Sequence, residues 1–536
     1  MAWWVLAAVV GVAAALAAPA RPASAHAVLT GSSPGPGAVV PALPAQIRLT
    51  FNEPVRVVPG RSQVVAPDGK RLNAGDPQPA HDGLTIRLRG TDGPTGTYVV
   101  SYRVISGDSH PVSGSFTFSV GAPSAPAAGA GPAGTDPIVR AAVPIAKYAG
   151  YLGLVLLIGP AVFLALWYPR RLPRRPPLRL ARAGLVTVAA GTVAGLWLQA
   201  PAASGAALLD VSPAELREVL LSPYGLTLLG RLLVLAVVAA LLPRLHRRPG
   251  RRLGAALTVA AAAGLLTWPL TGHPVASPHA ALLVAADVVH LGAMGLWIGG
   301  LLSLWALVLR RADPRELRLI LPSWSRWAMV CVYWLVAAGL VQALVQSGSL
   351  AAVTGTAYGR LILAKVGLVA GVLAVAAWSR RLVRRHGPPG RLRRSVGVEA
   401  AIAAVVLAAS AVLVQTGPGR TAEVRAAAEG FAATLTSPLY AVQFAVYPAV
   451  VGEYNSFHAF VFTPEGKALP VVEWTVTAAL PERGIEPMDN PVFTVTGNQG
   501  LGNLTFPLPG QWHLSITLRI SDFDQATVTT RIPVRR

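Results

Sequence analysis

The feature that most constrains this chain is a series of long apolar runs in its middle. A run of about 20 apolar residues is long enough to cross a bilayer as a helix. A backbone inside lipid must also satisfy its own hydrogen bonds, which favours helices. The runs occupy residues 143–167, 183–203, 222–243, 253–271, 280–309, 324–346, 358–379 and 396–416. The sequence therefore predicts a polytopic α-helical membrane domain of about eight helices over residues 137–419.

Basic residues concentrate in every second connection between these runs. The clusters are Arg170, Arg171, Arg174 and Arg175; Arg244, Arg247, Arg248 and Arg251; Arg310, Arg311 and Arg315; and the stretch from Arg380 to Arg394. Such clusters are typical of cytoplasmic loops, so the formal net charge of +22 does not indicate a nucleic-acid-binding face. The pattern predicts a multi-pass protein of the cell (inner or plasma) membrane with both termini outside.

The N-terminus has the pattern of a secretory signal. Residues 3–19 are apolar, and Ala23-Ser24-Ala25 supplies the small residues that signal peptidase requires. We therefore expect a signal peptide over 1–25 and His26 as the first residue of the mature chain. An uncleaved anchor is the alternative, because only the α-amino group is positive before the apolar run.

Two further regions alternate between apolar and polar residues with the period of half-buried strands. The first, 26–120, predicts an all-β Greek-key sandwich or barrel of the cupredoxin or immunoglobulin-like kind. The second, 432–536, predicts an immunoglobulin-like β-sandwich. A Gly/Ala/Pro-rich linker spans 121–136. The fold class is thus multidomain, and the orientation of the membrane domain predicts that both β-domains are extracytoplasmic.

Copper-binding chemistry is concentrated in the first β-domain. A free N-terminal His26 offers its amine and its Nδ1 to one metal. Asp108 and His110 lie two residues apart and would share a face of a strand. An amine, two imidazoles and a carboxylate favour Cu(II). Taken singly, Asp108 is also a candidate turn cap, and His110 a packed side chain.

This domain resembles the periplasmic copper-resistance family CopC. The resemblance lies in the opening His26-Ala27-Val28-Leu29-Thr30, the strand at 49–54 and the Gly-Asp-Ser-His-Pro-Val-Ser-Gly motif at 107–114. It implies that His26, Asp108 and His110 bind Cu(II). Some members also hold Cu(I) at methionines. The chain has no methionine between Met1 and Met294, so we expect that second site to be absent.

The fifth apolar run contains Asp287, His290 and Met294 on one helical face, at spacings of three and four. Ionisable groups within the bilayer are costly and usually functional, so these residues are candidates for a copper path. A histidine hydrogen-bonded between helices and a gap-filling methionine are the alternatives. His273 and His279, in the preceding outer loop, are candidates to pass copper inward or are merely exposed.

An internal similarity relates the two halves of the membrane domain. Tyr224-Gly225 precedes Arg231 by the spacing at which Tyr358-Gly359 precedes Lys365. Two halves of four spans each would form a parallel repeat, as in some transporters. We expect Arg231 and Lys365 to hold anionic groups or to extend toward the interface.

The segments 289–301 and 358–365 resemble the membrane family CopD, whose members accompany CopC, are sometimes fused to it, and are implicated in moving copper across the inner membrane. The C-terminal domain is similar to YtkA-like domains found beside copper proteins. His458, Met488 and His513 in this domain are expected to have surface or packing roles rather than to bind metal.

We therefore predict a non-enzymatic protein that captures Cu(II) outside the membrane and supports copper import, homeostasis or resistance. Its expected partners are copper ions, the lipid bilayer and extracytoplasmic copper chaperones, with no nucleic acid. Two alternatives are a copper monooxygenase that uses an N-terminal histidine brace and a haem membrane oxidoreductase with paired helix histidines. The sequence has no Walker phosphate loop, which argues against ATP-driven export.

Overall fold

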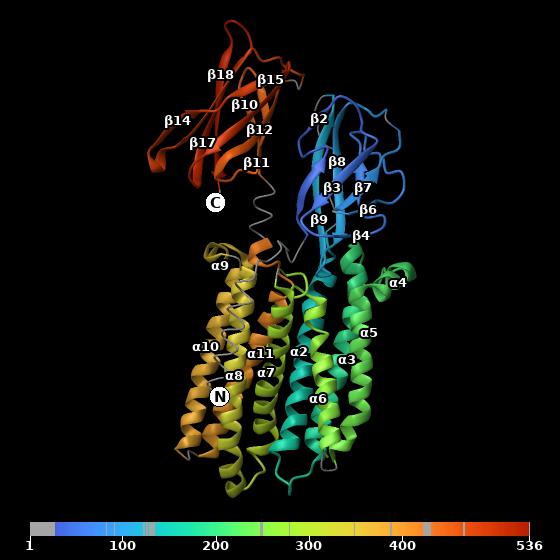
Figure 1. Cartoon of the computed structure of the whole chain (residues 1–536), viewed down its shortest axis with the longest axis vertical. Coiled ribbons are helices and arrows are strands. Elements are labelled where there is room, and N and C mark those ends of the chain that lie inside the picture. Colours follow the sequence, from blue (N-terminus) through green and yellow to red (C-terminus); the bar gives the residue numbers. More distant parts are fainter. Residues whose placement is uncertain are drawn as a thin grey trace. The chain divides into compact units, whose positions relative to one another are not determined.

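The computed structural model describes residues 27–534, apart from 82, 91, 122–123, 125–126, 128–133, 247–249, 278, 348, 386–387, 422–429 and 465–466. The predicted signal peptide, His26 and most of the predicted linker lie outside this described part. The described chain divides into two compact units (Figure 1). One contains Ile105–Pro111 and Ala133–Arg420, and the other contains Ala27–Val104, Val112–Pro132 and Thr421–Arg536.

The N-terminal β-domain is a two-sheet sandwich, as the alternating pattern predicts. One sheet has the order β1 (Leu29–Ser33), β3 (Gln46–Phe51), β7 (Gly83–Arg87) and β6 (Gln78–Ala80). The other has the order β2 (Val39–Val40), β9 (Pro111–Val120), β8 (Gly96–Ile105) and β4 (Arg56–Val57), with β5 (Gln63–Val65) paired to β8. Alternate residues such as Ile47, Leu49 and Tyr98 are fully buried in one shared core.

The C-terminal domain is also a two-sheet sandwich. Its first sheet has the order β10 (Phe431–Thr436), β11 (Ala441–Tyr447), β12 (Gly452–Phe462), β16 (Gln499–Phe506) and β15 (Val492–Thr496). Its second has the order β14 (Ile485–Asp489), β13 (Glu473–Leu480), β17 (Gly510–Arg519) and β18 (Gln525–Val534). Phe457 from the first sheet and Trp512 from the second are completely buried in the core between them.

Eight helices in the described part are long and apolar enough to cross a membrane, which confirms the predicted number. They are built on α2 (Pro137–Leu166), α3 (Arg175–Ser204), α5 (Pro223–Leu241), α6 (Arg251–Leu266), α7 (Ala280–Ser303), α8 (Pro314–Ser347), α10 (Ala357–Arg384) and α11 (Pro389–Leu413). Several begin earlier than predicted. Helix α8, for example, starts at Pro314. Its first turns are polar, so the apolar run used for the prediction does not include them.

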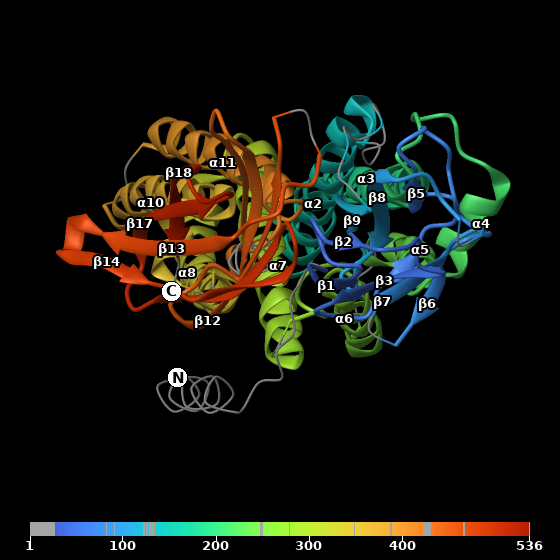
Figure 2. The same cartoon turned by 90° about the horizontal axis from the view of Figure 1, so that it is seen from above.

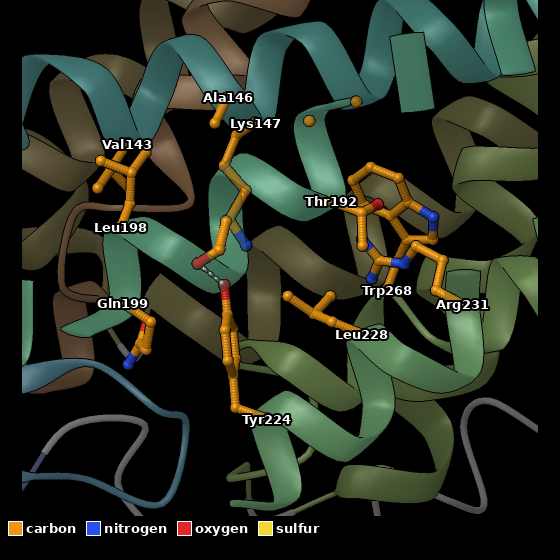
Figure 3. Close-up of a pocket in the computed structure, with 13 residues that line it drawn as sticks. Val143, Ala146, Lys147, Thr192, Leu198, Gln199, Tyr224, Leu228, Arg231 and Trp268 are labelled. Atoms are coloured by element: carbon orange, nitrogen blue, oxygen red, sulfur yellow. Dashed lines mark hydrogen bonds between the residues drawn. The ribbon is translucent and has the colours of Figure 1, made fainter. Parts of the chain in front are cut away.

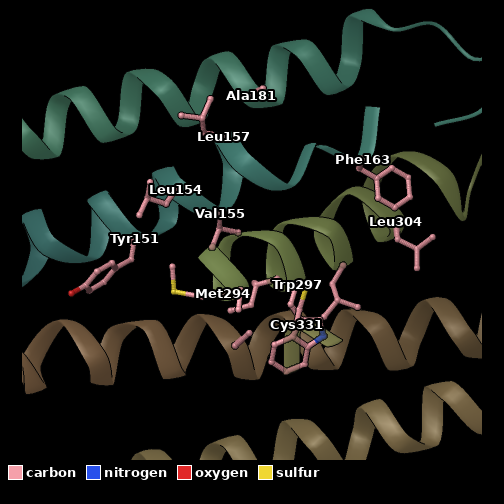
Figure 4. Close-up of a cluster of buried hydrophobic side chains, with 14 of the residues drawn as sticks. Tyr151, Leu154, Val155, Leu157, Phe163, Ala181, Met294, Trp297, Leu304 and Cys331 are labelled. Atoms are coloured by element: carbon pink, nitrogen blue, oxygen red, sulfur yellow. The ribbon is translucent and has the colours of Figure 1, made fainter. Parts of the chain in front are cut away.

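Helix α2 lies between α3 and α7 (Figure 1; Figure 2). Glycines allow this close approach, since a Cβ on Gly159 would lie 2.2 Å from the backbone of Gly299. The core beside this contact is apolar, with Val155, Met294 and Trp297 in one cluster (Figure 4). The close packing of α2 and α7 brings the polar residues of both helices to the same interior.

The internal similarity in the sequence has a structural counterpart. A short helix precedes each motif, α4 (Pro213–Leu221) in the first half and α9 (Leu350–Gly355) in the second. Ser222 Oγ accepts the Gly225 amide at 3.1 Å, and Thr356 Oγ1 accepts the Gly359 amide at 3.0 Å. A Cβ would meet a carbonyl oxygen at 2.0 Å in Gly225 and at 2.1 Å in Gly359. Both motifs therefore need a glycine for the same steric reason.

Candidate metal centre

A tight turn between β8 and β9 carries the motif histidine and aspartate. The Ser106 amide donates to the His110 carbonyl at 3.0 Å, and the Ser109 amide donates to the Ser106 carbonyl at 2.9 Å. Ser109 has φ +70°, in the left-handed region that non-glycine residues rarely adopt. Such conformations persist where the surrounding contacts fix them, and they concentrate at functional sites.

The two carboxylate oxygens of Asp108 have different surroundings. Oδ1 accepts the His110 amide at 3.1 Å and the Ser106 hydroxyl, so it caps the turn. Oδ2 lies 2.8 Å from His273 Nδ1. The structure brings Asp108 and His110 together through this turn rather than through alternation along a strand, with Oδ1 and His110 Nδ1 3.2 Å apart.

His273 comes from the loop between α6 and α7, two residues after the short 3₁₀ helix Pro269–Thr271. The Ser277 hydroxyl donates to its carbonyl at 2.6 Å, and its ring stacks on His110 with centroids 4.9 Å apart. Both His273 and Asp108 are buried, with exposed fractions of 4% and 1%. Asp108, His110 and His273 each offer a ligand atom within 4.8 Å of the others.

This donor set fits a transition metal, because imidazole suits copper and a carboxylate adds negative charge. The turn that carries two of the donors and the loop that carries the third belong to the same compact unit. His273 was predicted to pass copper inward or to be merely exposed, whereas the structure buries it beside Asp108 and His110. His26, the third predicted ligand, lies outside the described residues and stays a prediction.

A cavity of about 460 Å³ extends from this cluster into the helices. His110 and His273 line it together with the predicted path residues Asp287, His290 and Met294. His290 Nδ1 lies 2.9 Å from the Leu335 carbonyl, which is the helix–helix hydrogen bond predicted as its alternative role. A histidine with one nitrogen so engaged still has Nε2 for a ligand.

His279 belongs to neither feature, because it precedes the first residue of α7 and is not among the residues of the cluster or of the cavity lining. Lys147, which is in α2 and lines the cavity, was not predicted from the sequence. Neither was Glu399, which is 1% exposed, accepts the Ser379 hydroxyl and lines a second cavity of about 240 Å³. In both cases the available signal was a lone ionisable residue within an apolar run.

Arg231 behaves differently from both predicted alternatives. Its Nε donates to Thr267 Oγ1 at 2.8 Å, one terminal nitrogen donates to the Thr267 carbonyl at 2.9 Å, and the guanidinium lies 4.1 Å above the Trp268 ring. It lines a small cavity of about 40 Å³ with Lys147 and Tyr224 (Figure 3). Arg231 is thus satisfied by a hydroxyl, a carbonyl and an indole rather than by an anion or the interface.

The C-terminal histidines do not approach one another. His458 lies on β12 with its neighbours Phe457 and Ala459 in the core, so its own side chain is on the outer face of that sheet. Its ring packs at a tilt of 59° against Phe460 with centroids 4.6 Å apart, and burial lowers the pKa of its imidazole. His513 lies on β17 in the opposite sheet, also between core residues. The core separates the two imidazoles, which fits packing roles.

Comparison with protein families covers most of this architecture. The CopC domain model matches residues 29–121, the model for the copper resistance protein D-like N-terminal domain matches 138–281, and the copper resistance protein D model matches 318–413. The chain is a CopC–CopD fusion. The C-terminal sandwich lies beyond the matched residues, so its similarity to YtkA-like domains stays a prediction.

The chain is also similar to one curated relative and to two solved structures. The copper transport protein CutJ of Bacillus subtilis (strain 168) is 25% identical over 401 residues, which cover 72% of this chain and 73% of CutJ. The crystal structure of CopC from Methylosinus trichosporium OB3b is 28% identical over 19% of this chain and 97% of its own, with a TM-score of 0.16. That of PcoC, a methionine-rich copper resistance protein from Escherichia coli, is 30% identical over 18% and 99%, with a TM-score of 0.15. By its family domains and its similarity to CutJ, the CopC–CopD fusion is a copper-binding, multi-pass membrane protein of the copper-resistance and copper-transport families.

Proposed function

We propose that this CopC–CopD fusion captures Cu(II) on the outer side of the membrane and passes copper into its membrane domain for import, in copper homeostasis or resistance. One observation carries the proposal. Asp108, His110 and His273 form one cluster of possible ligands, and the two histidines of this cluster line a cavity that His290 and Met294 also line.

In the proposed capture site, His26 supplies its amine and Nδ1, and the turn supplies Asp108 and His110. These donors make a nitrogen-rich tetragonal set suited to Cu(II). His273 then acts as the receiving ligand. Its ring is stacked 4.9 Å from that of His110, and Asp108 faces both imidazoles, so copper exchanges ligands with little movement.

Beyond His273, the proposed path uses Asp287, His290 and Met294. The imidazole and the thioether suit copper, and the carboxylate attracts a cation into an otherwise apolar cavity. The proposal is non-enzymatic. The Asp108 carboxylate, as an added ligand at the capture site, would fill a coordination position that an oxygen-activating copper enzyme keeps open for its substrate.

The proposed orientation places both β-domains and both termini outside the membrane. Its support is the arginine content of alternate loops. Two of those loops meet at one end of the helices, where Arg171 Nε lies 2.9 Å from the Glu316 carboxylate. The capture turn leads out of β8, which belongs to the N-terminal sandwich.

Copper binding to the purified full-length protein tests the capture site. We expect the nitrogen-rich EPR signal of Cu(II) to change in His26→Ala and His110→Ala, with affinity at least about tenfold lower, the free energy of one metal–ligand contact being above about 1.4 kcal/mol. His81→Ala, on an exposed turn of the same β-domain, is the matched control. An unchanged signal and affinity in His26→Ala would remove the central claim.

Copper accumulation in cells tests the path and its direction. We expect His290→Ala to lower copper content while the purified variant keeps the Cu(II) signal, because His290 lies in the cavity and not in the capture set. Normal accumulation would exclude a path through His290. Higher accumulation would show export instead. Reductant-dependent peroxide formation by the purified protein would favour an oxidoreductase.

A further inference from the structure

The charges that line the large cavity do not balance. Lys147 on α2 and Lys365 on α10 both line it, and Asp287 on α7 is the one acidic residue among its described lining residues. Asp287 interacts electrostatically with both lysines. The lining histidines add no negative charge. One carboxylate therefore stands against two ammonium groups in a cavity that is otherwise mainly apolar.

An incoming copper ion makes this imbalance larger. Buried charges are tolerated when they are paired, and a like charge in a low-dielectric site opposes further cations. Within the described part of the chain, no ion pair of 4.0 Å or less joins Asp287 to either lysine. Lys147, Lys365 and Asp287 thus line the cavity without forming a direct ion pair with one another.

The same cavity contains an unused hydrogen-bond donor. Gln342 on α8 lines it, and its Nε2 is buried without a hydrogen-bond partner among the described residues. Buried donors are nearly always satisfied by protein, water or a ligand. An amide N–H and two ammonium groups that line one cavity make up the donor set of an anion site.

The third cation of this region does not change the balance. Arg231 lines the small neighbouring cavity and is engaged by Thr267 and Trp268. The large cavity, at about 460 Å³, exceeds the roughly 30 Å³ share of one water many times. It has room for copper and a counter-ion together.

We propose that this cavity binds a small monovalent anion, a halide or a carboxylate, between Lys147, Lys365 and Gln342, and that copper crosses the cavity accompanied by it. Asp287 then offsets one lysine and the anion offsets the other. The anion site is supported by the set of charged and polar residues that line the cavity. Its part in transport rests on the proposed function.

Anion binding is tested on the purified full-length protein in copper-free detergent solution. Chloride, bromide or acetate replaces gluconate, a larger anion, at constant ionic strength, and the thermal unfolding midpoint is followed. We expect a saturable rise of the midpoint in the wild type that is lost in Lys365→Met and weakened in Gln342→Leu. Lys467→Met, an exposed lysine of the C-terminal domain, should retain the rise. Comparing chloride with acetate distinguishes a halide from a carboxylate.

An absence of saturation, or the same rise in Lys365→Met, would overturn the anion site. The wild type and each variant are compared with themselves in two anions. An overall change of stability in a variant therefore does not alter the anion-dependent rise of its unfolding midpoint. Bromide anomalous scattering in crystals offers a direct measurement, with a peak expected beside Lys147 and Lys365.

Copper uptake into proteoliposomes tests the role of the anion in transport. We expect uptake at least about fivefold faster in the favoured anion than in gluconate, and no anion dependence in Lys365→Met. Uptake independent of the anion in the wild type would overturn co-passage. Saturable anion binding without any copper uptake would instead overturn the proposed transport function and leave the anion site standing.

Discussion

The two halves of the membrane domain share one local motif, but the cation that follows the motif has different surroundings in each half. In the first half, Tyr224-Gly225 leads to Arg231, which lines a cavity of about 40 Å³. In the second, Tyr358-Gly359 leads to Lys365, which lines a cavity of about 460 Å³. The helix starts are alike in capping and in glycine contacts, so the difference arises further along the helices.

Trp268 accounts for much of that difference. Its ring lies 4.1 Å from the Arg231 guanidinium and stacks on Tyr151 with centroids 5.2 Å apart. An aromatic side chain of this size fills space and satisfies the cation at once. The repeated motif thus fixes the backbone at the start of each helix. The neighbouring side chains decide whether the cation further along is bound by the protein, as Arg231 is, or lines an open cavity, as Lys365 does.

The largest expected effect separates Arg231 from Lys365. Arg231→Met removes two hydrogen bonds and the cation–π contact, so the free energy of unfolding should fall by about 2–4 kcal/mol, with copper affinity unchanged. Lys365→Met should leave the unfolding free energy unchanged or higher and reduce copper uptake. Chemical denaturation and proteoliposome uptake measure the two. If Arg231→Met and Lys365→Met changed the free energy of unfolding and the copper uptake equally, the two cations would not differ as proposed.

The two motif glycines should behave alike. Gly225→Ala and Gly359→Ala each place a methyl group against a backbone carbonyl at 2.0 and 2.1 Å, so backbone must shift. We expect each to lower the free energy of unfolding by about 2–3 kcal/mol. Gly371→Ala, where the added Cβ meets nothing within 4 Å, is the control within α10. A loss in only one of the motif variants would show that the helix starts are not equivalent.

The two tyrosines should differ by a smaller amount. Tyr358 donates to Gln346 Oε1 at 2.6 Å, whereas Tyr224 donates to the Gly195 carbonyl at 3.4 Å, close to the limit of a hydrogen bond. Tyr358→Phe leaves a buried acceptor unsatisfied and should cost about 1–2 kcal/mol, and Tyr224→Phe less than about 0.5 kcal/mol. Thermal unfolding of the two variants sharpens the comparison. The reverse order would contradict it.

The smallest expected effect concerns two glutamines, Gln199 on α3 and Gln342 on α8. Gln199 Nε2 donates to the Ser109 carbonyl at 2.8 Å and so supports the turn of Asp108, while Gln342 lines the large cavity. Gln199→Ala should weaken Cu(II) affinity about two- to threefold without changing stability, because it loosens the turn and removes no ligand. Gln342→Leu should leave that affinity unchanged. Isothermal titration or competition with a copper chelator measures both.

The sequence by itself determined the features that depend on local patterns. Run length and charge gave eight spans, alternation gave two sandwiches, and the motif around Asp108 and His110 identified copper chemistry. These follow from near-neighbour physics, since hydrophobic periodicity and turn residues act over a few positions. The spacing of Asp287, His290 and Met294 likewise indicated one helix face, which lines the cavity.

Only the tertiary structure decided which groups meet. His273 lies 165 positions from Asp108 in the chain, and no periodicity relates them, yet they are 2.8 Å apart. Arg231 and Lys365 share a motif, but Trp268 engages one and leaves the other in an open cavity. Charge compensation and cavity volume depend on side chains that long-range packing brings together, so the sequence predicted the chemistry of the candidate ligands and the fold determined their arrangement.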